Sequence, residues 1–328
     1  MDIQRYAPEL SEEWDDFVRE SNNGTLFHYR SFLSYHQDRT FLDHSLLFRK
    51  GGHIVAVFPA AELEQEGKRV LYSHPGASFG GFVFHRLPYS DADDLVQLFE
   101  DYAREQGFDS TFFVPPPLFY FKKTDQTLEY VLRWRGYAAS ETYISSVIEL
   151  DRPYDELLGR VCRRKKRSRR FFRRLITEND VVMDWCDDFE SFYPILEENK
   201  ARHDRKPTHS LEELFELKRR FPDEINLLLM RSGDTPVGGT LLFTGNSDVV
   251  IIFYNMIDYG YSHLQPATLQ VLESMRWAEE RGFTRLDFGV SQKPQAPNPL
   301  TPSPSLIRFK EELCSHAMIR QAFEKSFD

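Results

Sequence analysis

The sequence predicts an α/β fold built from two tandem copies of one unit, each containing a mixed sheet. Apolar, β-branched runs such as 249–254 alternate along the chain with amphipathic stretches such as 91–106 and 266–280. This alternation is typical of strands and helices that pack in layers. Short similar segments also recur in the same order in the two halves of the chain, which indicates an internal duplication.

Three pairs of segments carry the duplication. Segment 103–114 resembles 278–289, 14–17 resembles 189–192, and 46–51 resembles 228–233. The first two pairs share one offset in residue number, and the third differs from it by a few residues. We therefore expect an N-terminal domain at 1–150 and a C-terminal domain at 151–328, with the basic segment 160–174 as connector or as the start of the second copy.

The elements expected in the first copy follow from local patterns. Strands are predicted at 2–6, 45–48, 54–59, 110–114 and 142–150, with two more strands around a small-residue turn within 70–83. Residues 50–53, with two glycines, are typical of a hairpin turn. Helices are predicted from an N-cap at Ser11 through Val18, at 27–36 and at 91–106, where Gly107 ends the helix.

In the second copy, one unit of strand, loop, helix and strand organises the prediction. The strand at 249–254 leads through a glycine-bearing loop to a helix that begins at Pro266, and a strand resumes at 285–288. Proline suits the first helical position because its missing N–H would be unpaired there. Such a helix N-terminus offers backbone N–H groups to an anion, for example the phosphate of a donor substrate. Further predictions are a strand at 237–244, a basic helix at 160–174 and a last helix that starts near Lys310.

Composition excludes several classes of protein. Of the 328 residues, 41% are hydrophobic and 28% are charged, which is typical of a soluble globular chain. The N-terminus is polar, and no apolar run reaches the roughly 18–20 residues that a spanning helix needs. Three scattered cysteines give no metal-binding spacing, so the sequence predicts a cytoplasmic protein without a metal.

The charge is distributed unevenly. The net charge is −10, yet 160–174 contains ten Lys and Arg residues and no acid, so the other residues sum to −20 (−10 less +10). Because the rest of the chain is so acidic, a DNA-binding surface is not expected, whereas one local anion site in the basic segment is. Either a phosphate-bearing ligand or an acidic patch of the same protein is expected to face these cations.

Several motifs together resemble those of a known family. They are Gly76–Gly81, the basic segment, Arg202–Ser210, Gly238-Gly239-Thr240, Gln265–Thr268, Leu286–Gly289 and Arg308–Glu311. With the element order of each copy, they resemble the tandem GNAT acyltransferase fold of the Fem-type transferases and the related BioF2-like GNAT proteins. The resemblance covers nearly the whole chain and implies transfer of an acyl or aminoacyl group to an amine.

The donor has two candidate classes. The acyl-CoA pyrophosphate signature Arg/Gln-x-x-Gly-x-Gly/Ala is absent, because the corresponding residues His263–Ala267 lack its glycines. Acyl-CoA and aminoacyl-tRNA therefore both stay open as donors. The candidate residues for donor binding are Gly238, Gly239, His263, Gln265, Ala267 and Thr268, together with Arg163, Lys166, Arg167, Arg170 and Arg174 of the basic segment.

The resemblance also implies where the chemistry lies. GNAT-like sheets hold the reacting carbonyl where two neighbouring strands separate, and 237–244 and 249–254 are the expected pair. Tyr254 is a candidate proton donor, Asp287 a candidate to orient the amine, and Lys310 a candidate to face the acceptor or the developing oxyanion. Each has a purely structural alternative: an interfacial tyrosine, a loop anchor and a surface lysine. Paired glycines are explained equally well by a bulge or by tight packing.

The acceptor is expected to contact both copies. The candidate residues are Tyr72, His74, Ser78 and Phe79 in the first copy, and Arg202, His203, Lys206, His209 and Asn255 in the second. The expected acceptor is a small or lipid-linked cell-envelope precursor or an amino sugar, and a lipid-linked acceptor would bring transient contact with a membrane surface. Two alternatives remain: an aminoacyl-tRNA-dependent peptidoglycan-type transferase, and a non-catalytic ligand-binding protein on a transferase scaffold.

Overall fold

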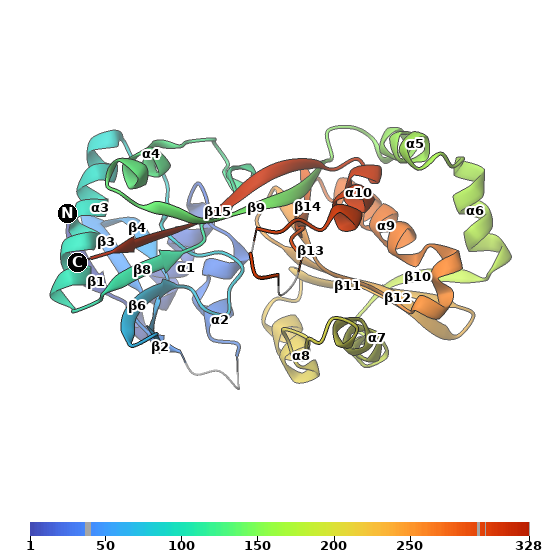
Figure 1. Ribbon diagram of the computed structural model, residues 1–328, viewed down its shortest axis with the longest axis horizontal. Coiled ribbons are helices and arrows are strands. Elements are labelled where there is room, and N and C mark those ends of the chain that lie inside the picture. The colour runs from blue at the N-terminus through green and yellow to red at the C-terminus, as the bar shows by residue number, and fades with distance from the viewer. Residues whose placement is uncertain (37–40, 294–295, 299, 328) are drawn as a thin grey trace. The chain divides into compact units, whose positions relative to one another are not determined.

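Two units, each with strands and helices, make up the computed structural model, which describes residues 1–36, 41–293, 296–298 and 300–327 (Figure 1). The first comprises Met1–Tyr143 together with Ile319–Asp328, and the second comprises Ile144–Met318. The predicted α/β class with tandem units is confirmed. The predicted boundary at residue 150 lies just after a strand, β9 (Ala138–Glu149), within which the two units divide.

The first unit has two groups of paired strands. One group has the order β1-β3-β4-β7 and is antiparallel throughout. The other has the order β15-β8-β6-β5-β2, in which only β6 and β8 run parallel. The bounds are β1 (Asp2–Arg5), β2 (Leu42–Asp43), β3 (Leu46–Lys50), β4 (His53–Phe58), β5 (Ala61–Gln65), β6 (Lys68–Ser73), β7 (Val83–Phe84), β8 (Ser110–Phe113) and β15 (His316–Ser326), with helices α1 (Ser11–Glu20), α2 (Arg30–Leu33), α3 (Tyr89–Glu105) and α4 (Thr127–Trp134).

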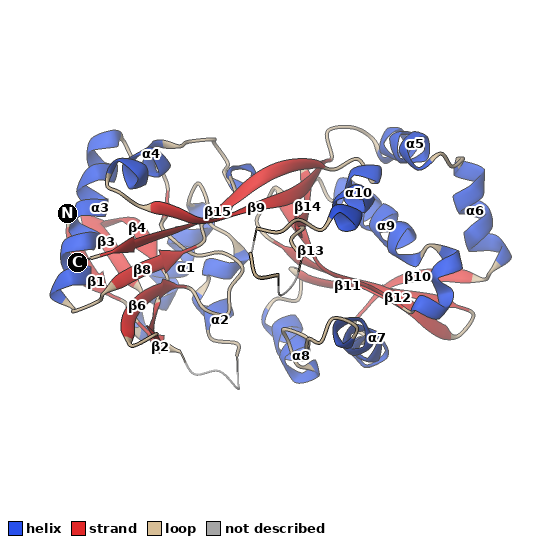
Figure 2. Ribbon diagram, in the orientation of Figure 1, coloured by secondary structure: helices blue, strands red, loops and turns tan. Residues whose placement is uncertain are grey.

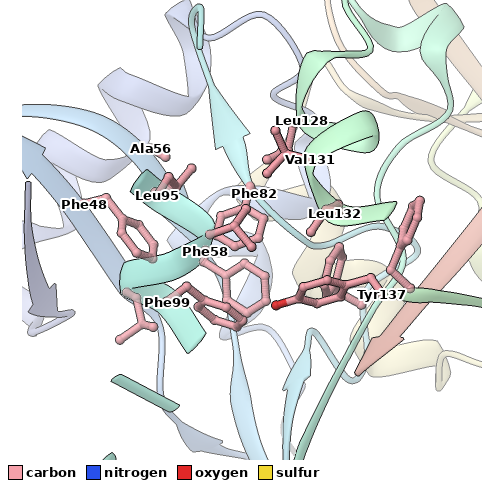
Figure 3. Close-up of a cluster of buried hydrophobic side chains, with 14 of the residues drawn as sticks. Phe48, Ala56, Phe58, Phe82, Leu95, Phe99, Leu128, Val131, Leu132 and Tyr137 are labelled. Atoms are coloured by element: carbon pink, nitrogen blue, oxygen red, sulfur yellow. The ribbon is translucent and has the colours of Figure 1, made fainter. Parts of the chain in front are cut away.

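Phenylalanine rings fill the core of the first unit (Figure 3). The ring centroid of Phe58 lies 4.7 Å from that of Phe82 and 4.8 Å from that of Phe99, and both ring pairs are tilted. Tilted and edge-on contacts are the favourable geometries for aromatic pairs. The C-terminal strand β15 adds Phe323, whose ring stacks on Phe113 at 5.7 Å. The last residues of the chain therefore complete the core that the first residues begin.

The second unit is one mixed sheet covered by helices on both faces (Figure 2). Its strand order is β10-β11-β12-β13-β14-β9, and only the pair β13 and β14 is parallel. Helix α9 packs on one face and α7 on the other, so that the adjacent glycines 238 and 239 meet side chains from α9 and α7 respectively. The bounds are β10 (Val181–Cys186), β11 (Ile225–Ser232), β12 (Thr235–Thr244), β13 (Val249–Ile257), β14 (Arg285–Val290), α5 (Tyr154–Lys165), α6 (Arg169–Glu178), α7 (Phe189–Ala201), α8 (Leu211–Arg220), α9 (Pro266–Glu280) and α10 (Pro304–Glu312).

The repeated segments occupy equivalent elements in the two units. Helix α3 and β8 of the first unit correspond to α9 and β14 of the second, and each helix is followed by a left-handed glycine, Gly107 (φ 72°) or Gly282 (φ 80°). Segments 14–17 and 189–192 both lie near the start of a helix and bury their aromatic residues. The third pair of segments ends a strand at a left-handed Gly51 or Gly233.

Three local predictions are wrong. The basic segment is two helices, because Lys166 adopts a left-handed conformation (φ 52°) between α5 and α6. Ser11 is the first residue of α1 rather than its N-cap, since the turn Pro8–Leu10 already precedes the helix. Of the helix predicted at 27–36, only the short α2 and a preceding 3₁₀ turn at Leu26–His28 form.

Candidate active site

Strands β13 and β14 separate in the middle of the second unit. They pair from Val249 with Arg285 to Ile251 with Asp287, and among the described residues no strand covers β13 on that side beyond Ile251. Residues 249–252 are buried, whereas Phe253 and residues 255–257 are partly exposed. This part of β13 is exposed because β14 no longer lies beside it. The Asn199 side chain bonds to the backbone N–H and C=O of Ile257. The backbone groups of β13 between Ile251 and Ile257 that face this side have no strand partner in the described chain, so a ligand could bind them.

The predicted pair of separating strands is wrong. Strands β12 and β13 stay paired from Gly238 with Ile257 to Thr244 with Val250, with one irregularity beside Leu241. The strand that leaves is β14, whose pairing with β9 also shifts between Asp287 and Val290. Gly289 has a φ of 67° within this shift, a conformation that glycine adopts without strain.

Lys310 lies against the irregular part of β14. Its Nζ donates hydrogen bonds to the carbonyl oxygens of Gly289 (2.8 Å) and Val290 (2.9 Å). The Asp287 carboxylate accepts a hydrogen bond from the Gly289 N–H (2.7 Å) and one from the Ser145 hydroxyl (3.3 Å). Asp287 and Lys310 are each 3% exposed. Lys310 lies in the last turn of α10, so its predicted position at the start of that helix is wrong.

Burial sets the proton affinity of Lys310. Removal from water lowers the pKa of its ammonium to about 8, although the nearby Asp287 carboxylate acts in the opposite direction. The lysine is thus mostly cationic at neutral pH but loses its proton in mildly alkaline solution. A buried cation beside backbone groups that lack a strand partner is suited to stabilise negative charge on a substrate oxygen.

The two adjacent glycines of β12 are explained by packing. A Cβ on Gly238 would lie 2.1 Å from the side-chain nitrogen of Gln270, and one on Gly239 would lie 2.5 Å from the ring of Phe192. Side chains of the protein itself therefore occupy the space above both glycines. This removes the reason for placing a cofactor over them.

A buried polar network joins this strand to α9. The Thr240 hydroxyl lies 2.9 Å from the side-chain oxygens of both Asn255 and Gln270. Asn255 donates to the carbonyl oxygen of Ala267 (3.3 Å), and Gln270 donates to that of Met256 (3.3 Å). Asn255 thus fixes the start of α9 against β13. Thr240 belongs to the predicted motif Gly238-Gly239-Thr240 but was given no role of its own. Gln270 was not predicted, although a glutamine within the apolar run Leu269–Leu272 is a detectable signal.

Tyr254 anchors the loop between α7 and α8. Its hydroxyl oxygen accepts a hydrogen bond from the Thr208 N–H (3.2 Å) and lies 3.0 Å from Nδ1 of His209. Tyr254 and His209 are each 2% exposed, and burial raises the pKa of the phenol to about 12. Tyr254 is therefore protonated at neutral pH. A capping box of Ser210 and Glu213 begins α8 and ends the loop.

The same loop is rich in cations. Arg202, His203 and Lys206 are all exposed, and the Arg202 guanidinium lies over the Tyr259 ring (4.1 Å) while it pairs with Glu198. Lys200, which was not predicted, lies 5.1 Å from the Tyr254 ring centroid. Burial, and secondarily Arg205, lowers the pKa of Lys200. A half-buried ammonium next to other cations is a favourable place for an anionic group of a ligand.

The start of α9 has the predicted form. Gln265 is left-handed (φ 52°), Pro266 is the first helical residue, and no side chain caps the helix. His263 is exposed with its ring 6.3 Å from that of Tyr261, Ala267 is half-buried, and Thr268 is buried. Glycine usually occupies a left-handed position such as that of Gln265. The acyl-CoA signature has glycines in this loop, whereas here the position carries a glutamine side chain.

The basic segment divides into paired and unpaired cations. Lys165 pairs with Glu312, Arg169 with Asp155, and Arg174 with Glu178. Of the five predicted contact residues, Arg174 is thus engaged by a carboxylate of the protein. Arg163, Lys166, Arg167 and Arg170 are exposed, and no carboxylate of the described chain forms an ion pair with them.

The predicted residues of the first unit lie around β6. Tyr72 is half-buried with its ring 4.9 Å from that of Phe112. His74 is buried, which lowers the pKa of its imidazole to about 4, and its Nδ1 lies 2.7 Å from the carbonyl oxygen of Pro75. Phe79 is 3% exposed and packs between Phe27 and Tyr120, so it belongs to the core.

Strand β15 adds a cation to this region. The Arg320 guanidinium donates a hydrogen bond to the Ser78 carbonyl oxygen and lies 4.9 Å from the Phe79 ring centroid. Its positive charge acts to lower the pKa of the Tyr72 and Tyr143 phenols, against the larger effect of burial. The Tyr143 hydroxyl donates a hydrogen bond to Glu141. Arg320 was not predicted, because only the return of residues 319–328 to the first unit brings it here.

Two further properties concern metals and membranes. Among residues 1–36, 41–293, 296–298 and 300–327, no cluster of three or more His, Cys, Asp or Glu side chains has an arrangement that could hold a metal ion. No helix of the described chain is both long and apolar enough to span a bilayer.

Comparison with known proteins identifies the fold family. Residues 162–295 match the family described as Acetyltransferase (GNAT) domain. This range contains the separating strands β13 and β14 and the whole of α9. Residues 162–295 thus match a GNAT acetyltransferase domain, and the whole chain has the fold of tandem GNAT proteins. No curated protein matches the sequence.

Three solved structures have a similar fold over nearly the whole chain. FemX superposes with a TM-score of 0.75 at 13% identity, covering 99% of this chain and 97% of FemX. A tandem GNAT protein from the clavulanic acid biosynthesis pathway gives 0.56 at 12%, covering 100% and 98%. The C-terminal domain of a putative lysylphosphatidylglycerol synthetase from Agrobacterium fabrum gives 0.56 at 11%, covering 96% and 91%. At these identities the likeness establishes a shared fold.

Proposed function

We propose that this GNAT protein transfers an acyl or aminoacyl group to the amine of a cell-envelope precursor or an amino sugar. The observation that carries the proposal is the separation of β13 from β14 beside the buried pair of Asp287 and Lys310. The name of one protein of similar fold, a putative lysylphosphatidylglycerol synthetase, favours an aminoacyl donor and an envelope acceptor.

The reaction assigns a role to each part of the second unit. The acceptor nitrogen attacks the carbonyl carbon, a C–N bond forms, and the bond to the leaving thiol or hydroxyl breaks. Backbone N–H groups of β13 between Ile251 and Ile257 hold the carbonyl oxygen, and the Lys310 ammonium stabilises its developing charge. The proton lost by the attacking amine ends on the leaving group. Asp287 keeps Lys310 cationic and holds the turn at Gly289.

The acceptor and donor sites follow from the cations and the helix start. Lys200, Arg202, His203 and Lys206 would bind an anionic group of the acceptor, on a loop that Tyr254 and His209 hold in place. Tyr72 and Ser78 would line the acceptor site of the first unit, supported by His74 and Phe79. The donor, acyl-CoA or aminoacyl-tRNA, would approach the start of α9 at His263–Thr268, where Asn255 fixes the helix.

The direct test is an assay for amide formation. Purified protein is incubated with acetyl-CoA or with aminoacylated tRNA, and with nucleotide-linked amino sugars, and the product is detected by mass spectrometry. We expect an amide from one donor class, and we expect Lys310→Met to lower kcat by about a hundredfold or more. Lys50→Met is the matched control, because Lys50 is exposed on β3 and pairs only with Asp91.

The outcome separates the transferase from a ligand-binding protein. Turnover that depends on Lys310 but not on Lys50 supports the proposal. Binding of the amino sugar without turnover of either donor by the wild type would show a binding module on a transferase scaffold. Equal rates for wild type and Lys310→Met would remove Lys310 from the reaction centre.

A further inference from the structure

A group of six cations on the second unit has no role in the proposed reaction. They are Arg160, Arg163, Lys166, Arg167, Arg170 and Arg173, here called the basic surface. All six are exposed, and no carboxylate of the described chain forms an ion pair with any of them. Like charges on neighbouring helical turns repel one another, so an external anion would stabilise this arrangement.

The local structure places these cations together. The left-handed residue Lys166 ends α5, and α6 begins at once with the Ser168 side chain as its N-cap. The basic surface thus spans the end of one helix, a turn and the first half of the next. In the second unit α6 contacts the edge strand β10, whereas α5 contacts α9 and α10 (Figure 1).

The apolar sides of both helices are already in use. Leu157, Val161 and Phe172 are buried in the core of the second unit, and Leu175 and Ile176 pack against it. Within 160–174 the only other aromatic ring, that of Phe171, is half-buried with the Arg167 guanidinium 4.9 Å from its centroid. The basic surface therefore offers charge but neither an apolar wedge nor an open ring.

We propose that the basic surface binds an anionic phospholipid bilayer and holds the protein reversibly at its face. Lysine and arginine side chains near such a bilayer are attracted by its negative surface potential, and the attraction is additive over several residues. Because no apolar side chain is available for insertion, binding is electrostatic and sensitive to salt. This inference is independent of the proposed reaction and of its substrates.

A bilayer fits the surroundings of the basic surface better than RNA does. Carboxylates flank it in sequence on both sides: Asp151, Asp155 and Glu156 near the start of α5, and Glu178 and Asp180 at the end of α6. All of these except Asp180 also pair with Arg152, Arg169 or Arg174. RNA phosphates are fixed along a strand and would run past these acids, whereas lipids diffuse laterally and gather under the cations. RNA readers also rely on stacked aromatic rings, which this surface does not present.

The test is sedimentation of the full-length protein with lipid vesicles. One set is phosphatidylcholine alone, and the other contains equal parts of phosphatidylcholine and phosphatidylglycerol. The variant Arg163→Gln/Arg167→Gln/Arg170→Gln removes three charges from the basic surface. The control Arg219→Gln/Arg276→Gln/Arg281→Gln removes three exposed arginines of α8, α9 and the residue after α9. Neither set includes a residue placed in the core, so both variants should fold.

We expect the wild type to bind only the anionic vesicles, and less as salt is added. The first variant should lose affinity on the order of a hundredfold, as expected for three cations at the bilayer face, and the control only a few-fold. Failure of the wild type to bind the anionic vesicles overturns the proposal, as does an equal loss in both variants. A transfer-RNA mixture is the competing probe: tighter binding to it than to vesicles, lost in the first variant, would assign the basic surface to RNA.

Discussion

Tyr254 could act either as a proton donor in the reaction or as a structural anchor for a loop. Its hydroxyl is buried, keeps its proton at neutral pH and bonds to Thr208 and His209 of the α7–α8 loop. A proton donor must also reach the leaving group, whereas these partners already occupy its hydroxyl. We therefore assign Tyr254 to holding the loop that carries Arg202, His203 and Lys206.

We expect Tyr254→Phe to lower the free energy of unfolding by about 1–3 kcal/mol, because the Thr208 N–H loses its acceptor. The Michaelis constant for the acceptor should rise while kcat changes little. The matched control is Tyr193→Phe, since the Tyr193 hydroxyl donates one bond to the His209 carbonyl at 3.3 Å and is partly exposed. A loss of kcat at unchanged stability and Michaelis constant would instead make Tyr254 the acid.

Gly238 and Gly239 illustrate why residue roles are hard to assign from sequence. Paired glycines suggested either a backbone that approaches a ligand or tight packing. The distinction depends on which side chains of α9 and α7 lie above the sheet, and these are remote in sequence. Gln270 and Phe192 fill that space.

Gly238→Ala should destabilise the protein by about 1–3 kcal/mol, because its Cβ would meet the Gln270 side chain and the Met256 carbonyl. The double variant Gly238→Ala/Gln270→Ala should lose less stability than the sum of the two single variants, since the nearer contact is removed. Chemical denaturation of the four proteins of this cycle measures the coupling. Additive losses would contradict the packing account.

At the scale of elements, strongly periodic segments were predictable and points of irregularity were not. The strands at 249–254 and 285–288 and the helix from Pro266 form as expected. The break at Lys166 was missed because a run of basic residues carries no glycine or proline to mark a turn. The partner that separates from β13 was also missed, since strand pairing depends on contacts remote in sequence.

The break between α5 and α6 gives a prediction of its own. Lys166 has a φ of 52° and a ψ of 45°, which costs a side-chain-bearing residue about 1–2 kcal/mol. Lys166→Gly should therefore stabilise the protein by about 1 kcal/mol. Arg163→Gly, which removes the same charge from within α5, should destabilise it by about 1 kcal/mol. Urea unfolding distinguishes the two, and a loss of stability in both would mean that residue 166 is helical.

At the scale of the whole molecule, the duplication was readable from sequence, but the return of the chain end was not. Each copy carries matching helix–glycine–strand segments, so a tandem fold followed from the order of the motifs. The pairing of β15 with β8, from Phe323 with Phe113 to Ser326 with Ser110, has no local signal. It brings Arg320 to Ser78 and sets Lys325 against the buried Glu100 at 2.7 Å.

Phe323→Ala should destabilise the first unit by about 3–5 kcal/mol, because a buried ring stacked on Phe113 is lost. Ile319→Ala is the control within the same strand, since Ile319 is 64% exposed. Hydrogen exchange should show faster opening of β8 and α3 in Phe323→Ala, with β11 and β12 unchanged. Equal loss of protection in the second unit would contradict the assignment of β15 to the first.

The central claim is that the Lys310 cation stabilises the reacting oxygen beside the separated strands. The most direct measurement compares the pH dependence of kcat for wild type and Lys310→Arg, because arginine stays protonated throughout. With a pKa of about 8, Lys310 holds its proton below pH 8 and loses it above, so the active form declines there. The ratio of variant to wild-type kcat should then rise about tenfold per pH unit above pH 8, while deprotonation of the acceptor amine affects both proteins alike. A ratio that stays constant across pH 8, or a wild-type rate that gains relative to the variant, would contradict the claim.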